Sequence, residues 1–136
     1  MLVLKAPRRM LLLRGDRVLR EYRVALGRNP DGPKRHHLDR RTPEGRYTID
    51  RRSQDSRYYR ALHVSYPNDR DRDFARLAGV DPGGGVMIHG VPDGERWVGA
   101  AQRFYDWTNG CIAVTDDEMD EIWELVDDGT PIEIRP

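Results

Sequence analysis

The chain has 136 residues, which is the size of one domain rather than two. Its 23 basic and 23 acidic side chains give no net charge, and this balance argues against a disordered polyelectrolyte. No apolar run approaches the roughly 20 residues that a membrane span requires, so we expect no transmembrane segment. Residues 1–136 are therefore expected to form one polar, folded domain.

The two halves of the chain carry opposite charge. Residues 1–60 hold 17 basic and 7 acidic side chains, whereas residues 61–136 hold 6 basic and 16 acidic ones. The simpler interpretation is that the two halves fold against each other and neutralise one another. The alternative is a basic surface for a polyanion such as nucleic acid or a cell-wall polymer. Because aromatic side chains do not cluster in the basic half, we expect no nucleic-acid partner.

Short segments in which apolar and polar residues alternate dominate the chain and predict strands. Gly15-Asp16 predicts a hairpin turn between the second and third of them. A short helix is expected over 71–78, closed by Gly79. The strands are expected at 3–4, 9–13, 18–26, 46–50, 61–66, 86–89, 111–114 and 132–134.

The clearest helix is predicted to begin after Thr115. Thr115 and Glu118, three residues later, have the pattern of a capping box. The apolar residues that follow form one stripe of this helix: Met119, Ile122, Trp123 and Val126. Many short strands and little helix together predict a mainly β fold, either a sandwich or a barrel.

Two segments carry residues that are suited to covalent acyl transfer. In the first, an apolar strand ends at His89 and is followed by Gly90. In the second, an Asn109-Gly110 turn leads to Cys111, the single cysteine of the chain. A thiol nucleophile, an imidazole base and backbone N–H groups beside a glycine are the components that this chemistry requires.

Each of these segments has an ordinary structural explanation when it is taken alone. A histidine before a glycine is often structural, and Asn-Gly is a common hairpin turn. A lone cysteine is often a small buried hydrophobe, and it can form neither an intramolecular disulfide nor a cysteine-based zinc site. His36-His37 has no carboxylate or cysteine at ligand spacing, so we expect no metal and no cofactor.

In the order His89 then Cys111, 22 residues apart, the two segments resemble the catalytic domain of the YkuD-type L,D-transpeptidases. The family pattern is His-Gly, an intervening loop, and Ser/Thr-x-Gly-Cys followed by an apolar residue. Further segments resemble the family in the same order, so that the resemblance runs from about residue 3 to 134: 22–27, Lys34, 42–47 and 62–68.

The resemblance implies a β-sandwich-like fold with one or two short helices and a cysteine enzyme that acts on peptidoglycan stem peptides. Cys111 would be acylated with release of a terminal D-alanine, and His89 would take the thiol proton or stand as an imidazolium beside a thiolate. An amine would then resolve the thioester and give a 3–3 cross-link or a protein attachment. The implied compartment is the bacterial periplasm or cell wall, although we find no signal peptide at the start of the chain.

The resemblance also implies supporting roles for neighbouring residues. The backbone N–H groups of Gly110 and Cys111 would donate to an oxyanion, and Gly90 would help to orient His89. Thr108 would either orient His89 or bind substrate. Four residues would contact substrate: Asn109, His63, Tyr59 and Trp107. Trp97 and Tyr105 also flank the site segments.

This chain departs from the commonest family pattern at two positions. Asn109 stands where a histidine is frequent, and Ala113 stands where an arginine is frequent. Alanine cannot clamp a substrate carboxylate as arginine can, so the acyl donor or acceptor is left open. The alternatives are a hydrolytic variant, either an L,D-carboxypeptidase or an endopeptidase that releases wall-anchored protein, and a non-catalytic wall-binding or nucleic-acid-binding module.

Overall fold

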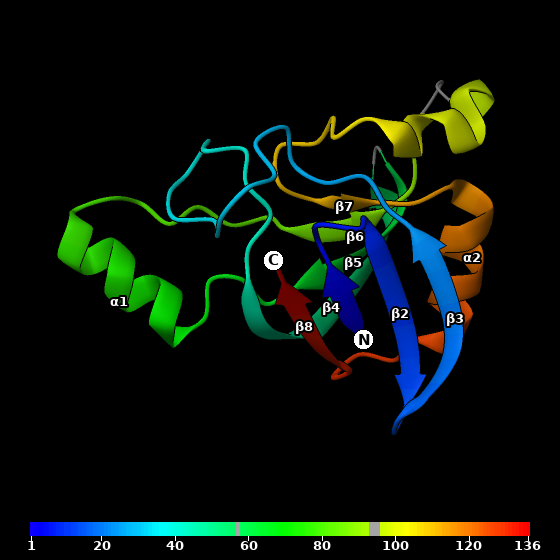
Figure 1. Cartoon of the computed structure of the whole chain (residues 1–136), viewed down its shortest axis with the longest axis horizontal. Coiled ribbons are helices and arrows are strands. Elements are labelled where there is room, and N and C mark those ends of the chain that lie inside the picture. The colour runs from blue at the N-terminus through cyan, green and yellow to red at the C-terminus, as the bar shows by residue number, and fades with distance from the viewer. Residues whose placement is uncertain (57, 93–95) are drawn as a thin grey trace.

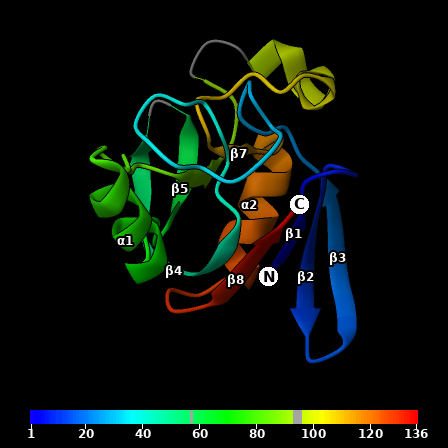
Figure 2. The same ribbon diagram turned by 60° about the vertical axis from the view of Figure 1, so that its left-hand side comes forward.

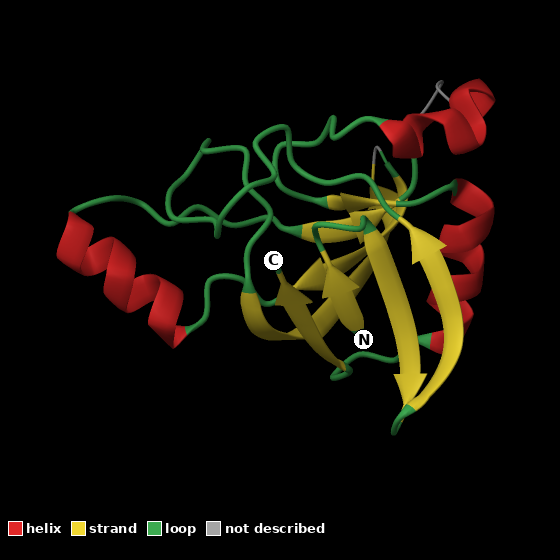
Figure 3. Cartoon of the chain, viewed as in Figure 1, coloured by secondary structure: helices red, strands yellow, loops and turns green. Residues whose placement is uncertain are grey.

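The computed structural model of the chain describes residues 1–56, 58–92 and 96–136 (Figure 1). The described elements are β1 (Leu2–Leu4), β2 (Arg9–Arg14), β3 (Arg17–Arg23), β4 (Gly45–Ser56), β5 (Tyr59–Val64), α1 (Asp69–Ala78), β6 (Met87–His89), the 3₁₀ helix η1 (Arg96–Phe104), β7 (Ile112–Ala113), α2 (Asp116–Leu125) and β8 (Pro131–Arg135). The expectation of a mainly β chain with few short helices is confirmed (Figure 3). Helix η1 was not predicted from the sequence.

The strands form one eight-stranded sheet in the order β3-β2-β1-β8-β4-β5-β6-β7. Strand β4 joins the two parts of this sheet, because its first residues pair with β8 and its later residues pair with β5. Register shifts follow Ile49 and Ser53 within β4, and such irregularities bend a strand. The sheet therefore folds over, and Figure 2 shows α2 lying between its two parts.

The core lies between the folded sheet and α2. Val3 of β1, Ile49 of β4 and Ile88 of β6 are completely buried, as are Met119 and Ile122 of α2. The capping box predicted at the start of α2 is confirmed, since Thr115 Oγ1 accepts from the Glu118 N–H at 3.1 Å and the Glu118 carboxylate accepts from the Thr115 N–H at 3.0 Å. The first turn of α2 is thus held by hydrogen bonds to its N-cap.

Helix α1 has a different relation to the sheet. It begins at Asp69, two residues earlier than predicted, because Asn68 caps it through the Asp71 N–H. Gly79 ends it in the left-handed conformation, as expected. Ala75 is its buried residue, and Figure 1 shows α1 projecting from one end of the sheet. Among the described residues, no helix is long and apolar enough to cross a membrane.

The opposite charges of the two halves meet in the folded chain. Basic residues from the first half pair with acidic residues from the second half: Arg8–Asp106, Arg20–Glu121, Arg52–Asp128 and Arg60–Asp120. The Arg8–Asp106 pair has the shortest contact of the four, at 2.7 Å. The structure thus supports the simpler interpretation of the charge pattern, mutual neutralisation.

The N-terminal half also reaches the far edge of the sheet. After β3 the chain continues to Ala25, which pairs with Ala113 of β7, and to Gly27, which pairs with Thr108. The strand predicted over 18–26 therefore ends at Arg23, and Ala25 makes an isolated bridge instead. A side chain at Gly27 would lie 2.3 Å from the Arg40 carbonyl oxygen, so the loop from 28 to 44 returns closely against this edge.

The capping box of α2 should contribute to global stability, because this helix carries Met119, Ile122 and Trp123 into the core. We expect Thr115→Ala to lower the free energy of unfolding by about 1 kcal/mol, measured by urea denaturation. Thr115→Ser keeps a hydroxyl at the cap and is the matched control. Equal stability of the alanine and serine variants would contradict the assignment.

Candidate active site

The two predicted site segments lie side by side in the sheet. Strands β6 and β7 are parallel, with Ile88 opposite Ile112 and His89 opposite Ala113. Ile88 and Ile112 are completely buried in the core. Since successive side chains of a strand point to opposite faces, His89 and Cys111, which directly precedes β7, share the face away from that core. The pairing therefore brings the imidazole and the thiol to diagonal positions on neighbouring strands.

His89 is held in one orientation and one tautomer. Its Nδ1 lies 2.6 Å from the Gly90 carbonyl oxygen, which can only accept a hydrogen bond. Nδ1 therefore carries the proton, and Nε2 keeps the lone pair that a general base needs. The Tyr58 ring stacks on the imidazole at 4.3 Å between centroids, and Trp107 meets it edge-on at 5.8 Å.

Gly90 fits a position where no side chain could stand. A Cβ atom there would lie 2.2 Å from Asp116 Oδ1 and 3.3 Å from the Tyr58 carbonyl oxygen. The same Asp116 oxygen accepts from the Val91 N–H at 3.0 Å, and the Val114 N–H donates to the His89 carbonyl at 3.0 Å. These contacts fix the backbone of Gly90, whose carbonyl oxygen accepts the hydrogen bond from His89 Nδ1.

The surroundings of the site favour neutral forms of both central groups. Burial lowers the pKa of His89 to about 4, although the bond to Gly90 opposes this change. Burial also raises the pKa of the Cys111 thiol, against a backbone hydrogen bond from Met87 and the charge of Lys34, which lower it. The thiol donates to the Gly85 carbonyl at 3.5 Å. The resting pair is therefore a thiol and an imidazole rather than a thiolate and an imidazolium.

The turn before Cys111 is held by Thr108. Its hydroxyl donates to the Cys111 carbonyl at 2.7 Å and accepts from the Gly110 N–H at 3.1 Å. Thr108 thus orients the peptide of the cysteine, whereas its predicted role was to orient His89 or to bind substrate. The Gly110 N–H, expected to donate to an oxyanion, is engaged by this hydroxyl in the present structure. Asn109 is exposed at the tip of the turn.

Two residues expected to contact substrate have different surroundings. His63 of β5 is opposite Met87 and therefore shares the face of His89 and Cys111. Its Nδ1 is paired with Asp50, and both line a cavity of about 430 Å³ at the start of α1. Trp107 packs on His89, and its indole N–H donates to Gln102 Oε1 at 2.7 Å.

The structure does not bring Tyr59 to the site. Tyr59 has a φ of 72°, and its hydroxyl donates to Asp120 Oδ1 of α2 at 2.7 Å, so its side chain packs against the core. The neighbouring Tyr58 stacks on His89 instead. Tyr58 was not predicted from the sequence, because two adjacent tyrosines give no signal of which one faces the site. Tyr105 is exposed, and the side chain of Trp97 lies outside the described part of the chain.

Among the described residues, no group of three or more histidine, cysteine, aspartate or glutamate side chains could hold a metal ion. The chemistry that the described residues can support is instead a proton transfer from the Cys111 thiol to His89 Nε2, followed by attack of sulfur on a carbonyl carbon.

The contact between Gly90 and Asp116 can be tested without a substrate. Gly90→Ala should lower the free energy of unfolding by about 1–3 kcal/mol, because the methyl group overlaps the carboxylate. It should also change the rate at which iodoacetamide alkylates Cys111. Gly84→Ala is the matched control, since a Cβ there meets open space. Similar stabilities of the two variants would refute the steric argument.

Burial of His89 should make stability depend on pH in a defined direction. Between the unfolded pKa of about 6.5 and the folded value of about 4, the unfolded chain binds more protons than the folded one. The free energy of unfolding therefore falls as the pH drops through this window. His89→Gln should give a flatter profile in urea denaturation, and parallel profiles of the two proteins would count against the burial of a neutral imidazole.

Comparison with known sequences gives a consistent result. The profile of the YkuD family, described as the L,D-transpeptidase catalytic domain, matches residues 1–134. Over 112 residues the chain is 32% identical to YafK of Escherichia coli (strain K12), which is provisionally named an L,D-transpeptidase. That match covers 80% of this chain and 37% of YafK.

Solved structures show the same fold. Pgp2 of Campylobacter jejuni, a helical cell shape determining protein, superposes with a TM-score of 0.76 at 26% identity, over 98% of this chain and 46% of Pgp2. An L,D-transpeptidase from Mycobacterium smegmatis superposes with a TM-score of 0.65 at 18% identity, over 99% of this chain and 57% of that one. The chain thus spans less than half the length of YafK and Pgp2. The profile match over nearly all residues shows that the chain belongs to the YkuD family of L,D-transpeptidase catalytic domains.

Proposed function

We propose that this domain is a cysteine-dependent L,D-transpeptidase that acts on peptidoglycan stem peptides. The observation that supports this most directly is the tautomer of His89, whose Nδ1 donates to Gly90 while Nε2 is left as a base on the face that carries Cys111. Members of the family act on peptidoglycan, and on that ground we propose the bacterial periplasm or cell wall as the working compartment.

In the first half-reaction His89 Nε2 takes the thiol proton as Sγ attacks the carbonyl carbon that precedes a terminal D-alanine. The negative charge moves to the carbonyl oxygen, and we assign the Cys111 N–H to stabilise it. The tetrahedral intermediate collapses with breakage of the carbon–nitrogen bond, and the proton held by His89 passes to the leaving amine. Cys111 is left as a thioester.

In the second half-reaction an amine attacks the thioester carbonyl. His89 accepts the proton of the attacking amine and returns it to the departing thiol, so the free enzyme is restored. An amine from a second stem peptide gives a 3–3 cross-link, and a protein amine gives an attachment. We propose that a neutral imidazole serves both transfers, in agreement with the lowered pKa of His89.

The walls of the site suggest how substrate is held. Tyr58 and Trp107 pack on His89 and leave it little freedom to rotate, so we propose that they keep its Nε2 aimed at the reacting groups. Asn109 at the exposed tip of the turn and His63 on β5 are proposed to contact the stem peptide. Ala113 is completely buried and offers no charge for a carboxylate.

A hydrolytic variant is the second candidate, and the absence of a charged side chain at Ala113 favours it. Without an arginine at this position, the site lacks one group that could bind a substrate carboxylate, and we propose that this weakens binding of the amine acceptor. Water would then resolve the same thioester, giving a carboxypeptidase or an endopeptidase that releases wall-anchored protein. The carboxypeptidase shares every step up to the thioester with the transpeptidase and differs only in its capture, whereas the endopeptidase forms the thioester with release of the protein's amine in place of D-alanine.

The acylation step is tested by intact mass spectrometry after brief exposure to a tetrapeptide stem that ends in D-alanine. The wild type should gain the mass of the tripeptide acyl group and release D-alanine, whereas Cys111→Ala should do neither. His89→Gln should acylate at least about 100-fold more slowly, because it lacks the base.

Capture of the thioester is then followed with and without an amine acceptor. A product joined to the acceptor identifies a transpeptidase, and free tripeptide in its presence identifies the hydrolytic variant. D-alanine release by Cys111→Ala at the wild-type rate would overturn the proposal. Failure of the wild type to form an adduct with any stem peptide would do the same.

A further inference from the structure

The loop from Lys34 to Arg41 contains a buried ion pair beside the candidate site. Lys34 Nζ lies 2.8 Å from Asp39 Oδ1, and the two side chains are 4% and 5% exposed. Removing one member of such a pair leaves an uncompensated buried charge, which is strongly unfavourable. A pair this deeply buried is therefore a rigid part of the loop.

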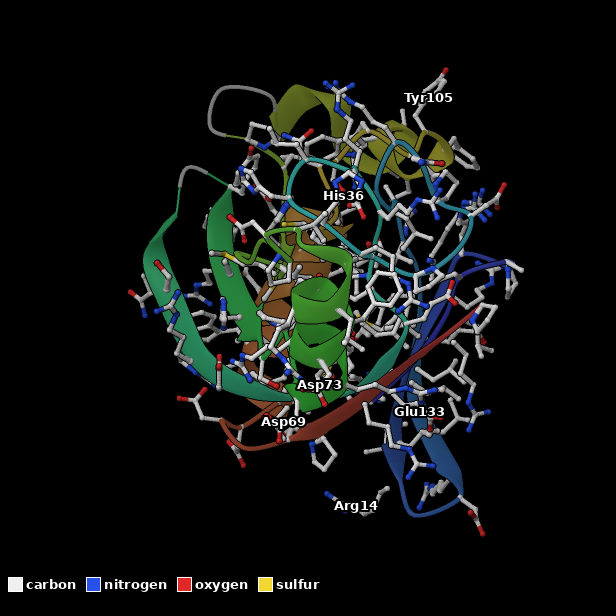
Figure 4. All side chains as sticks on the ribbon, turned by 90° about the vertical axis from the view of Figure 1, so that its left-hand side faces the viewer. Arg14, His36, Asp69, Asp73, Tyr105 and Glu133 are labelled. Atoms are coloured by element: carbon white, nitrogen blue, oxygen red, sulfur yellow. The ribbon has the colours of Figure 1, made fainter. Side chains whose placement is uncertain are left out.

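Asp39 is the centre of a dense set of hydrogen bonds. Besides Lys34, its carboxylate accepts from the backbone N–H groups of Arg35, His36 and Arg41, at 2.7, 3.1 and 3.1 Å. These bonds lower the pKa of Asp39 to about 2, although burial opposes the change. The carboxylate thus ties both ends of the loop to one point. Figure 4 looks onto this loop from the α1 side and labels His36 within it.

The backbone of the loop is strained on either side of this carboxylate. Leu38 and Arg40 have φ values of 63° and 59°, a region that non-glycine residues rarely occupy. Such conformations persist only where the surrounding structure holds them. Asp39 lies between these two residues and provides the bonds that hold them.

The far end of the loop touches the turn that carries the cysteine. The Arg41 carbonyl oxygen would lie 2.7 Å from a Cβ atom on Gly110, and Gly110 has a φ of 134°. The preceding carbonyl, of Arg40, accepts from the Asn29 N–H at 3.0 Å and abuts Gly27, which is bridged to Thr108. The loop therefore braces the turn on which Thr108 and Gly110 lie.

We propose that Lys34 and Asp39 are positioning residues of the candidate site, which hold the loop from 34 to 41 against Gly110 and so fix the place of the Lys34 ammonium. The role of these two residues in acyl transfer rests on the proposed function. Neither side chain contacts the reacting atoms. They act through the Arg41 carbonyl, which braces the turn, and through the position of one fixed charge.

The charge on Lys34 also affects the Cys111 thiol. The ionisable side chains on the described elements around the thiol are those of the loop, of His63 on β5, of His89 on β6 and of Asp81 before Gly85; on the loop they are Lys34, Arg35, His36, His37, Asp39, Arg40 and Arg41. Among these, Lys34 supplies the charge that lowers the pKa of Cys111 against burial. Because Asp39 holds Lys34 in place, loss of either residue should weaken this effect.

The test uses the pH dependence of Cys111 alkylation by iodoacetamide, followed by intact mass. Cys111 is the single cysteine of the chain, so the adduct reports on this thiol alone. We expect Lys34→Met and Asp39→Asn to slow alkylation at neutral pH by about tenfold, which is about one unit of thiol pKa. Lys34→Arg keeps the positive charge and should restore most of the rate.

The chain offers a matched control in its other lysine. Lys5 is 3% exposed, lies 2.9 Å from Glu44 Oε2 and donates to the Gly32 and Thr42 carbonyls. Lys5→Met therefore removes a buried lysine of the same kind, one that is paired with Glu44 and not with Asp39. We expect it to lose stability in urea denaturation as Lys34→Met does, but to keep the wild-type alkylation profile.

Hydrogen exchange provides the second measurement. The Gly110 N–H is protected by Thr108 Oγ1, so a loosened turn should speed exchange in a peptide spanning 108–113. Faster exchange in the Lys34 and Asp39 variants, but not in Lys5→Met, supports the proposal. Alkylation and exchange that match the wild type in folded Lys34→Met and Asp39→Asn would overturn it. Neither measurement needs a stem peptide, so its outcome is independent of whether the proposed acyl transfer occurs.

Discussion

The parallel pairing of β6 with β7 is the constraint on which the site depends. It places Ile88 opposite Ile112 in the core and, by strand alternation, turns His89 and Cys111 to the other face. A shift of one residue in this register would exchange the two faces and bury the thiol among core side chains. The chemistry of the site is therefore tied to the packing of two isoleucines, which have no chemical role of their own.

Close backbone contacts keep this arrangement in place. Gly90 abuts the Asp116 carboxylate, Gly27 abuts the Arg40 carbonyl and Gly110 abuts the Arg41 carbonyl. At each position the neighbouring segment occupies the space of a missing side chain, so segments far apart in the sequence approach closely. The site is bounded in this way by α2 on one side and by the loop from 28 to 44 on the other.

Burial shapes the electrostatics of the whole domain. Burial lowers the pKa of His89, which packs against the rings of Tyr58 and Trp107, whereas Lys34 and Asp39 are buried together as an ion pair. The pairs between the basic first half and the acidic second half join the two parts of the sequence at the surface, where exposed ion pairs contribute little stability individually. The buried Lys34–Asp39 pair differs from these exposed pairs, because it lies within a loop whose backbone is strained.

The sequence by itself determined the elements whose signals are local. Strand alternation predicted the β character, and Thr115 with Glu118 predicted the start of α2 correctly, because a capping box involves only residues three apart. The order and spacing of His89 and Cys111 were likewise sufficient to indicate the family.

Tertiary structure alone decided what depends on long-range contacts. Whether Tyr58 or Tyr59 faces His89 follows from the positive φ of Tyr59, which alternation cannot reveal. The length of β4 follows from its pairing with two different strands. The burial of Lys34 with Asp39 has the same origin, because charged residues in a polar loop ordinarily lie in solvent. Only the folded chain encloses that pair and brings the end of its loop against the turn that carries Cys111.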